Sequence, residues 1–321
     1  MNTERPLVSI IVITYNSAKF VLETLESARA QTYQNIELIV SDDGSTDETV
    51  NICNQWIEQN KERFVRTELI TANENTGIPA NCNRGVNAAK GEWMKLIAGD
   101  DILVNSAIQE AVQFFSGNAD IKIFDSRVEV YNENMSVKIG DYDINKDLFY
   151  YNGISAAEQL GLFVKRLDGR RIISTLGVFA SRKLIENIGG FDVKYKLLED
   201  APLWFKIMKS GIKFHYLDKV TVLYRRHENA ISKQPTNHDT NEKILSDFKL
   251  TVDQFMWDHF YERCDFLQKV NLIWMRGLSK IVICLGNKGI IAQLLYRCGR
   301  SLQPRRLHGL RRRYRELFKS I

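Results

Sequence analysis

The sequence predicts an α/β protein built on a mostly parallel β-sheet that is flanked by helices. Four short apolar runs, rich in β-branched residues, are typical of buried strands, and they cover residues 8–14, 36–41, 64–71 and 93–98. Helix-like segments lie between these runs. Strands that alternate with helices form right-handed βαβ units, in which consecutive strands are parallel.

The first two predicted helices have recognisable local signals. Apolar residues recur every three or four positions from Val21 to Ala28, as on one face of a helix. The second helix follows the stretch "GSTDET", in which Ser45 or Thr46 provides a capping-type start before the run 50–57. Both helices therefore fall between predicted strands, as the parallel arrangement requires.

The rest of the chain predicts further elements and a change of character near its end. A helix over 106–115, a strand over 121–131 and a polar, turn-rich patch over 132–152 come first. A strand over 175–181, helices over 182–191 and 201–209, and a strand pair over 212–225 follow. We therefore predict one large domain, 1–235, with halves that meet near residue 105, and a helical extension, 236–321.

Composition and cysteine usage narrow the class of protein. The 321 residues are 44% hydrophobic and 26% charged, which is an ordinary soluble composition with enough apolar residues for a full core. No apolar stretch reaches the roughly 18 residues that span a bilayer, and the N-terminus lacks a secretory pattern, so we expect a cytoplasmic protein. The five cysteines are scattered without CxxC spacing, which argues against a disulfide framework and a zinc site.

Positive charge is concentrated at the C-terminal end. Residues 297–321 carry eight arginines and one lysine against Glu316, a charge of +8, which leaves −3 for residues 1–296 of a chain whose total is +5. Apolar residues spaced by three or four alternate with these cations, as in a basic amphipathic helix on an anionic membrane. Two alternatives are a helix packed on the large domain and, less favoured, a nucleic-acid-binding segment.

Polar residues follow three of the predicted strands. The strand ends read "TYN" at 14–16, "SDDGS" at 41–45 and "AGDD" at 98–101, and ligands of such sheets bind beyond the carboxyl ends of the strands. Paired carboxylates can hold Mg²⁺ or Mn²⁺, which favours a diphosphate-containing substrate. The alternative is that these acids and hydroxyls only form turns and cap helices.

Four blocks of the sequence resemble the inverting glycosyltransferases of family 2, which have the GT-A (Rossmann-like) fold. The blocks are "VSIIVITYNSAKFVLETLESARAQTYQNIELIVSDDGSTDET", "NTGIPANCNRGVNAAKGEWMKLIAGDD", "GGFDVKYKLLEDAPLWFKI" and "VLYRRHENAIS". They agree with the family in type, spacing and order, and together extend over roughly residues 7–232.

The resemblance implies a role for residues of each block. It assigns the nucleotide-sugar to the strand ends and to the helix before the acidic motif, and the implied binding residues are Thr14, Tyr15, Asn16, Asp42, Asp43, Asn83, Arg84 and Asp100. The sequence departs from the family at Ala98, where many members have the first acid of the metal motif, and at Cys82, where many have Arg. Asp100 remains the best metal ligand, Asp101 is the second candidate, and Arg84 can compensate for Cys82.

The last two blocks imply a base and a basic loop. Asp200 occupies the position of the family's catalytic base, and Glu199 beside it can raise the base's proton affinity or bind an acceptor hydroxyl. Taken alone, these acids also suit the start of a helix. The loop residues Arg225, Arg226 and His227 match a family loop that binds the diphosphate, and His227 is also a candidate metal ligand.

These residues together predict an enzyme that uses Mn²⁺ or Mg²⁺. We expect transfer of one sugar, most simply from UDP-Glc, UDP-Gal or UDP-GlcNAc, to a lipid-diphosphate-linked saccharide in O-antigen or capsule synthesis, peripheral on the inner face of the cell membrane. The resemblance carries this expectation, and we expect no nucleic-acid partner. Two alternatives remain open: a catalytically inactive scaffold that binds nucleotide-sugar or membrane, and a sugar nucleotidyltransferase, which would want a Gly-rich basic signature near the N-terminus.

Overall fold

The computed structural model describes residues 5–141, 154–166, 175–195 and 199–228, and five isolated residues beyond them. The chain divides into two compact units, Met1–Ala230 and Ile231–Ile321. The predicted helical extension, including its basic end at 297–321, lies outside the described residues apart from the isolated positions 258, 270, 273, 274 and 277.

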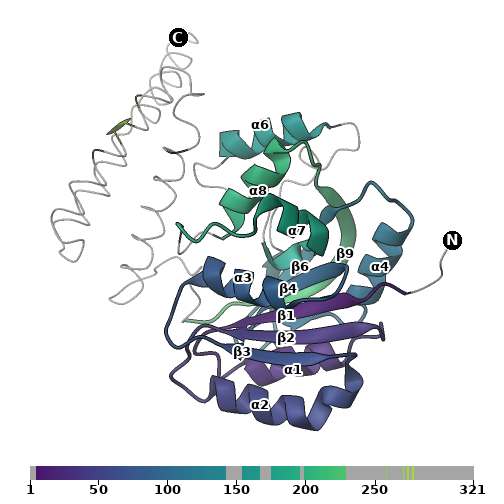
Figure 1. Ribbon diagram of the computed structural model, residues 1–321, viewed down its shortest axis with the longest axis vertical. Helices are drawn as coiled ribbons and strands as arrows, with labels where there is room; N and C mark the ends of the chain where they lie inside the picture. The colour runs from purple at the N-terminus through teal and green to yellow at the C-terminus, as the bar shows by residue number, and fades with distance from the viewer. Residues whose placement is uncertain are drawn as a thin grey trace, which may run out of the picture. The chain divides into compact units, whose positions relative to one another are not determined.

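The first half of the sheet is parallel. Its strands are β1 (Val8–Thr14), β2 (Ile36–Asp42), β3 (Thr67–Thr71) and β4 (Trp93–Ala98), in the order β3-β2-β1-β4 (Figure 1). They alternate with α1 (Val21–Arg29), α2 (Thr49–Asn60), a short 3₁₀ turn η1 (Lys61–Arg63) and α3 (Ile78–Ala88).

The second half extends the same sheet with mixed directions. The order continues from β4 through β8, β6, β9 and β5, and β7 pairs with β6. Strand β8 is antiparallel to both β4 and β6, whereas β6 and β9 are parallel. The elements are β5 (Ile102–Leu103), α4 (Ala107–Ser116), β6 (Ile123–Tyr131), β7 (Lys138–Asp141), α6 (Ala156–Arg166), η2 (Thr175–Gly177), β8 (Phe179–Ser181), α7 (Arg182–Ile188), α8 (Asp200–Lys209) and β9 (His215–Arg225).

The predicted fold class is confirmed, and three local predictions need correction. The predicted strand over 175–181 is the 3₁₀ turn η2 followed by the three-residue strand β8. The predicted strand pair over 212–225 is the single strand β9, because its pairing with β6 shifts register near Arg127 instead of turning back on itself. The polar patch contains β7, whose pairing with β6 gave no signal in the sequence.

The two faces of β1 pack against different helices. Ile10 and Val12 belong to the core that includes Val21 and Leu25 of α1, whereas Ile11 faces α3. Gly85 permits this second contact, since a Cβ at that position would lie 2.4 Å from Cγ2 of Ile11. The sheet is therefore covered on both sides, with α1 and α3 on opposite faces (Figure 1).

The strand order predicts a ligand crevice beyond the carboxyl ends of β1 and β4. The chain moves from β1 to β2 on one side and later crosses to β4 on the other side of β1. At such a switch point, ligands bind outside the carboxyl ends of the strands. The loops that begin at Thr14 and Gly99 lie at this point.

Candidate active site

The loops after β1 and β2 are tied together by side-chain hydrogen bonds. The Thr14 hydroxyl donates to Oδ2 of Asp42 over 2.9 Å. Asn16, which has a positive φ of 49°, donates its backbone N–H to Oγ of Ser45 and accepts from the N–H of Thr46 through Oδ1. Tyr15 between them is 47% exposed. The two loops therefore form one rim, and an aromatic ring stands on it in solvent.

Both acids of the "SDDGS" loop are buried and held by protein donors. Asp42 accepts from the backbone N–H of Ser45 over 2.8 Å in addition to Thr14. Asp43 accepts the backbone N–H groups of Thr76 and Gly77, the Thr76 hydroxyl and the guanidinium of Arg84. A carboxylate offers about four acceptor positions, so these four bonds occupy those of Asp43. Asp43 thus fixes the loop after β3 against the loop after β2.

Helix α3 supplies the cation and the amide that organise this rim. Arg84 pairs with Asp43 at 3.2 Å and donates to Oδ1 of Asn81 at 2.7 Å. Asn81 was missed in the sequence, although a carboxamide on the buried face of a predicted helix is a usable signal. It is buried, accepts from the Ser41 hydroxyl and donates to the carbonyl of Thr14.

The turn after β4 packs directly on the loop after β1. A Cβ at Gly99 would lie 2.8 Å from Cγ2 of Thr14, so only glycine allows this approach. Oδ2 of Asp100 lies 2.9 Å from Nε2 of His227, and the two side chains are 26% and 8% exposed. The structure therefore brings together two of the three predicted metal ligands at the crevice between β1 and β4.

Asp101, the third predicted ligand, points inward. Its Oδ1 accepts the backbone N–H of Arg225 over 2.9 Å, and its Oδ2 has no hydrogen-bond partner in the described part of the chain. Burial, with the negative charge of Asp100 as the next cause, raises the pKa of the Asp101 carboxyl well above its usual value. Its residue exposure is 0%, so a cation at the crevice reaches Asp100 first.

Arg225 is used inside the protein, and Arg226 is exposed. The Arg225 guanidinium, 1% exposed, donates to the carbonyls of Asp100 and Glu133, pairs with Glu23 and lies 4.6 Å from the ring centroid of Phe20. These contacts leave it directed at protein atoms, which contradicts the expectation that it binds phosphate. Arg226 donates its backbone N–H to Tyr131, and its side chain is free to point into solvent.

The predicted base lies at the start of α8. Asp200 is the first residue of the helix, half-buried, and its Oδ1 accepts the backbone N–H of Ala201 over 2.6 Å. Glu199 precedes it and accepts from the Thr175 hydroxyl of η2 at 3.4 Å. These bonds orient the two acids at the helix N-terminus, where negative charge is favoured.

The buried thiol of Cys82 is affected by acids from two distant parts of the sequence, Asp43 and Glu199. Burial raises the pKa of the Cys82 thiol, and the negative charges of Glu199 and Asp43 raise it further. Both acids therefore lie close enough to Cys82 to act on it, although they are distant in sequence. Asp43 of the acidic loop and Glu199 before α8 therefore both act on one residue of α3.

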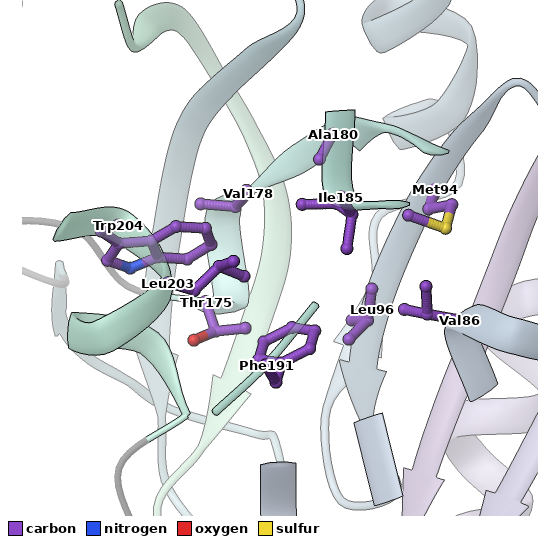
Figure 2. Close-up of a pocket in the computed structure, with 10 residues that line it drawn as sticks. All are labelled: Val86, Met94, Leu96, Thr175, Val178, Ala180, Ile185, Phe191, Leu203 and Trp204. Atoms are coloured by element: carbon purple, nitrogen blue, oxygen red, sulfur yellow. The ribbon is translucent and has the colours of Figure 1, made fainter. Parts of the chain in front are cut away.

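An apolar cavity is lined in part by α8, the helix that begins with the predicted base Asp200. Figure 2 shows that its lining comes from α3, β4, the η2–β8 segment, α7 and α8, and that the rings of Phe191 and Trp204 form part of the wall. Nε1 of Trp204 has no hydrogen-bond partner among the described residues. The lining residues are Val86, Met94, Leu96, Thr175, Val178, Ala180, Ile185, Phe191, Leu203 and Trp204.

Two further results concern metals and membranes. Within the described residues, no three His, Cys, Asp or Glu side chains are grouped so that they could hold a metal ion by themselves. None of the helices in the described part of the chain has the length and hydropathy needed to span a bilayer.

Solved structures identify the fold as GT-A. Residues covering 86% of this chain match 80% of Staphylococcus aureus TarS 1-349 in complex with UDP-GlcNAc, with a TM-score of 0.55 and 17% identity. The mannosyltransferase PcManGT from Pyrobaculum calidifontis, in complex with GDP-Man and Mn²⁺, has a TM-score of 0.54 at 18% identity, over 80% of this chain and 65% of that one. At such identities the likeness shows the fold alone.

Sequence relatives identify the family. The model described as glycosyl transferase family 2 matches residues 9–156. An uncharacterized glycosyltransferase of Haemophilus influenzae is 31% identical over 74% of this chain and 70% of its own length. The Escherichia coli UDP-Glc:alpha-D-GlcNAc-diphosphoundecaprenol beta-1,3-glucosyltransferase WfaP is 30% identical over 70% of this chain and 80% of its own. The chain therefore belongs to glycosyltransferase family 2.

A buried lysine beneath the site generates a prediction about pH. Lys95 of β4 donates to the carbonyls of Leu176 and Val178, and burial lowers its pKa to about 7 despite the opposing charges of Asp125 and Asp101. Between its unfolded pKa near 10.5 and its folded value, the unfolded chain binds a proton that the folded chain does not. The stability that the neutral lysine contributes is therefore lost as the pH falls through this window.

We predict that Lys95→Met removes this pH dependence. From pH 9 to pH 7 the wild-type free energy of unfolding should fall by roughly 1 kcal/mol per pH unit relative to the variant. Urea unfolding at pH 7, 8 and 9 measures the difference, and Lys183→Met, which removes an exposed lysine, should keep the wild-type slope. Parallel slopes for Lys95→Met and wild type would contradict the prediction.

Proposed function

We propose that this glycosyltransferase moves a single hexose from a UDP-sugar to a hydroxyl of a lipid-diphosphate-linked saccharide, with inversion, in the assembly of a bacterial surface polysaccharide of the O-antigen or capsule type. The main support is the crevice between β1 and β4, where the Asp100–His227 pair lies next to the loop of Thr14. The relative WfaP, by its name, uses UDP-Glc and a lipid-diphosphate acceptor, and TarS binds UDP-GlcNAc.

The nucleotide half of the proposed site is the rim formed by the loops after β1 and β2. Tyr15 offers an exposed ring on which a base can stack. Thr14 and Asn16 on either side of it are bonded to the loop after β2, and the buried acids Asp42 and Asp43 hold the rim in shape. Arg84 completes this half by compensating Asp43.

The Asp100–His227 pair fits a divalent cation that takes its other ligands from the substrate. Mg²⁺ and similar ions are commonly bound through one or two protein groups together with substrate phosphates and water. Asp100 offers a partly exposed carboxylate oxygen and His227 a largely buried imidazole nitrogen, 2.9 Å apart. A bound Mn²⁺ or Mg²⁺ would stabilise the charge of the departing diphosphate. Arg226, exposed beside His227, is the available cation for the phosphates.

The chemical step is a single in-line displacement. Asp200 accepts the proton of the acceptor hydroxyl, whose oxygen attacks the anomeric carbon from the face opposite UDP. The new glycosidic bond forms as the bond between that carbon and the diphosphate oxygen breaks, and UDP leaves with the bonding electrons. The negative charge of Glu199 beside Asp200 favours the protonated form of the base, which assists the transfer.

The two alternative functions make different demands on the sequence. An inactive scaffold would bind nucleotide-sugar or membrane without transfer, and Ala98 in the acidic motif is the feature that favours it. A sugar nucleotidyltransferase would want a Gly-rich basic signature near the N-terminus, and "VSIIVITYNSAKF" has none. Transfer of a sugar, as opposed to binding or nucleotide transfer, decides among the three.

A peripheral position on the inner face of the cell membrane suits a lipid-linked acceptor. The basic end, 297–321, is the segment we propose for this contact, because cations attract anionic headgroups and apolar residues at helical spacing can enter the interface. The catalytic domain then works next to the acceptor's lipid anchor.

The first prediction from the proposed function tests the sugar transfer and the catalytic base. Offered a panel of UDP- and GDP-sugars with a short lipid-diphosphate GlcNAc acceptor, the wild type should transfer one hexose from a UDP donor. Asp200→Asn should lower kcat by about 10²- to 10⁴-fold, since it removes a general base, and leave the calorimetric Kd for the donor unchanged. Glu186→Gln, on the exposed face of α7, serves as the control. Full activity of Asp200→Asn would refute the base assignment.

The second prediction concerns the metal. Asp100→Ala and His227→Ala should each raise the Mn²⁺ concentration needed for half-maximal transfer by about tenfold or more. Calorimetric titration of Mn²⁺ in the presence of UDP should show the same loss. Glu133→Gln changes a nearby exposed carboxylate that pairs with Lys19, and it should leave both measurements unchanged. Transfer that is unaffected by a chelator would rule the metal role out.

The third prediction concerns the basic end. Replacing Arg311, Arg312 and Arg313 by Gln should weaken binding to vesicles of anionic lipid about a hundredfold, at roughly 1 kcal/mol per cation. Replacement of the same residues by Lys keeps the charge and should keep the binding. Co-sedimentation at low and high salt measures both variants. Absence of vesicle binding by the wild type would favour a tail that packs on the protein instead.

A further inference from the structure

Asn83 of α3 is bound to the backbone N–H and C=O of a single residue, Phe191, by both ends of its carboxamide. Its Nδ2 donates to the carbonyl of Phe191 over 2.9 Å, and the N–H of Phe191 donates to its Oδ1 over 2.8 Å. The two residues are 108 positions apart in the chain. This paired arrangement uses one donor and one acceptor of the side chain, and it resembles the pairing of two strands.

The backbone before Phe191 is shaped to receive the carboxamide. Gly189 and Gly190 have φ values of 81° and 69°, in the left-handed region that favours glycine. A Cβ on Gly190 would lie 2.6 Å from Oδ1 of Asn83. The glycine pair that ends α7 therefore does two things: it turns the chain, and it leaves room for Asn83.

Phe191 packs near the helix that carries the proposed base, Asp200. The Phe191 side chain is buried and lines the same apolar cavity as Leu203 and Trp204 of α8, the helix that begins at Asp200. Figure 2 shows the Phe191 ring facing this cavity together with side chains of α3 and β4. Fixing the Phe191 peptide therefore fixes one wall against which the base helix packs.

A second asparagine on the same helix has a different set of partners. Asn81 binds Ser41, Arg84 and the carbonyl of Thr14, all on the nucleotide side of the site. Asn83 binds Phe191 alone among the partners identified within the described residues. Residues two positions apart on a helix point in different directions, so α3 holds the donor loops with one asparagine and the base segment with the other.

We propose that Asn83 is a positioning residue that clasps the Phe191 peptide and thereby sets the position of the Asp200 helix relative to the donor loops, and that it makes no contact with the nucleotide. This inference rests on the proposed function, because it takes Asp200 as the base. It replaces the nucleotide-binding role that the family resemblance implied for Asn83, and it gives the two adjacent glycines a reason.

The proposal makes a kinetic distinction. A residue that positions the base lowers kcat when it is removed, because a displacement of about 1 Å at the reacting groups can cost on the order of a hundredfold in rate. A residue that binds the nucleotide raises the donor KM and the Kd for UDP instead. The two roles therefore separate in one set of measurements.

The test compares Asn83→Ala with Asn81→Ala. Asn83→Ala should lower kcat about ten- to a hundredfold while the donor KM and the calorimetric Kd for UDP stay within about twofold of wild type. Asn81→Ala should raise the Kd for UDP. Hydrogen exchange gives a direct readout, since the amide of Phe191 should lose its protection in Asn83→Ala and keep it in Asn81→Ala.

Two more variants extend the test. Asn83→Asp changes the side chain that binds Phe191, and Gly190→Ala changes the backbone beside it. Asp can still accept the Phe191 N–H, but its other oxygen would face the Phe191 carbonyl in place of the Nδ2 donor, so its kcat should fall at least as far as that of Asn83→Ala. Gly190→Ala should reproduce the kcat loss by pushing Oδ1 of Asn83 away. Melting temperatures identify any variant that fails to fold, and Asn83→Asp, the smallest change, carries the test in that case.

Two outcomes overturn the proposal. One is a raised Kd for UDP with unchanged kcat in Asn83→Ala, and the other is a Phe191 amide that stays protected there. Failure of the proposed function looks different: the wild type transfers no hexose, or Asp200→Asn retains full activity. In that event the UDP affinity and the exchange of the Phe191 amide still report whether Asn83 holds the peptide or binds the nucleotide.

Discussion

The position of the acidic turn depends on one buried guanidinium. Arg225 donates to the carbonyls of Asp100 and Glu133 and pairs with Glu23 of α1, while its own backbone N–H binds Asp101. A charge buried in this way is tolerated only when its donors are satisfied, and the planar fork of arginine has enough of them in fixed directions. Arg225 therefore fixes the turn from the protein interior. The Asp100 carboxylate remains at the crevice, and Asp101 points away from it.

The alternation of β9 explains why one arginine is structural and its neighbour is not. Successive side chains of an extended chain point to opposite sides, so Arg225 and His227 share the side of the acidic turn, and Arg226 points to solvent. Phe20 contacts both inward residues, with its ring centroid 4.6 Å from the Arg225 guanidinium and 4.7 Å from the His227 ring. One aromatic ring thus packs against both the buried cation and the imidazole that reaches Asp100.

Periodicity predicted the sheet and its loops, but tertiary contacts decided which polar residues face the crevice. Strand ends place Asp100 and Asp101 together, yet only the position of β9 shows that one is accessible and the other buried. Lys95 lies inside an apolar strand run, and no local pattern predicts that it binds the η2 carbonyls. The strand pair expected over 212–225 failed for the same reason, since β6 offered a partner along its whole length.

Helix α3 carries Cys82, on which both Asp43 of the acidic loop and Glu199 before α8 act. Many family members have an arginine at this position. The Cys82 thiol, whose pKa is raised by burial and by the charges of Glu199 and Asp43, is neutral and does not replace that positive charge. The compensation for Asp43 comes instead from Arg84, a partly buried residue of the same helix. The helix thereby keeps the acids close without burying a cation between them. Because Asn81 and Asn83 bind the helix to the Thr14 loop and to the Phe191 backbone, the distance between those parts follows from the rigidity of a single helix.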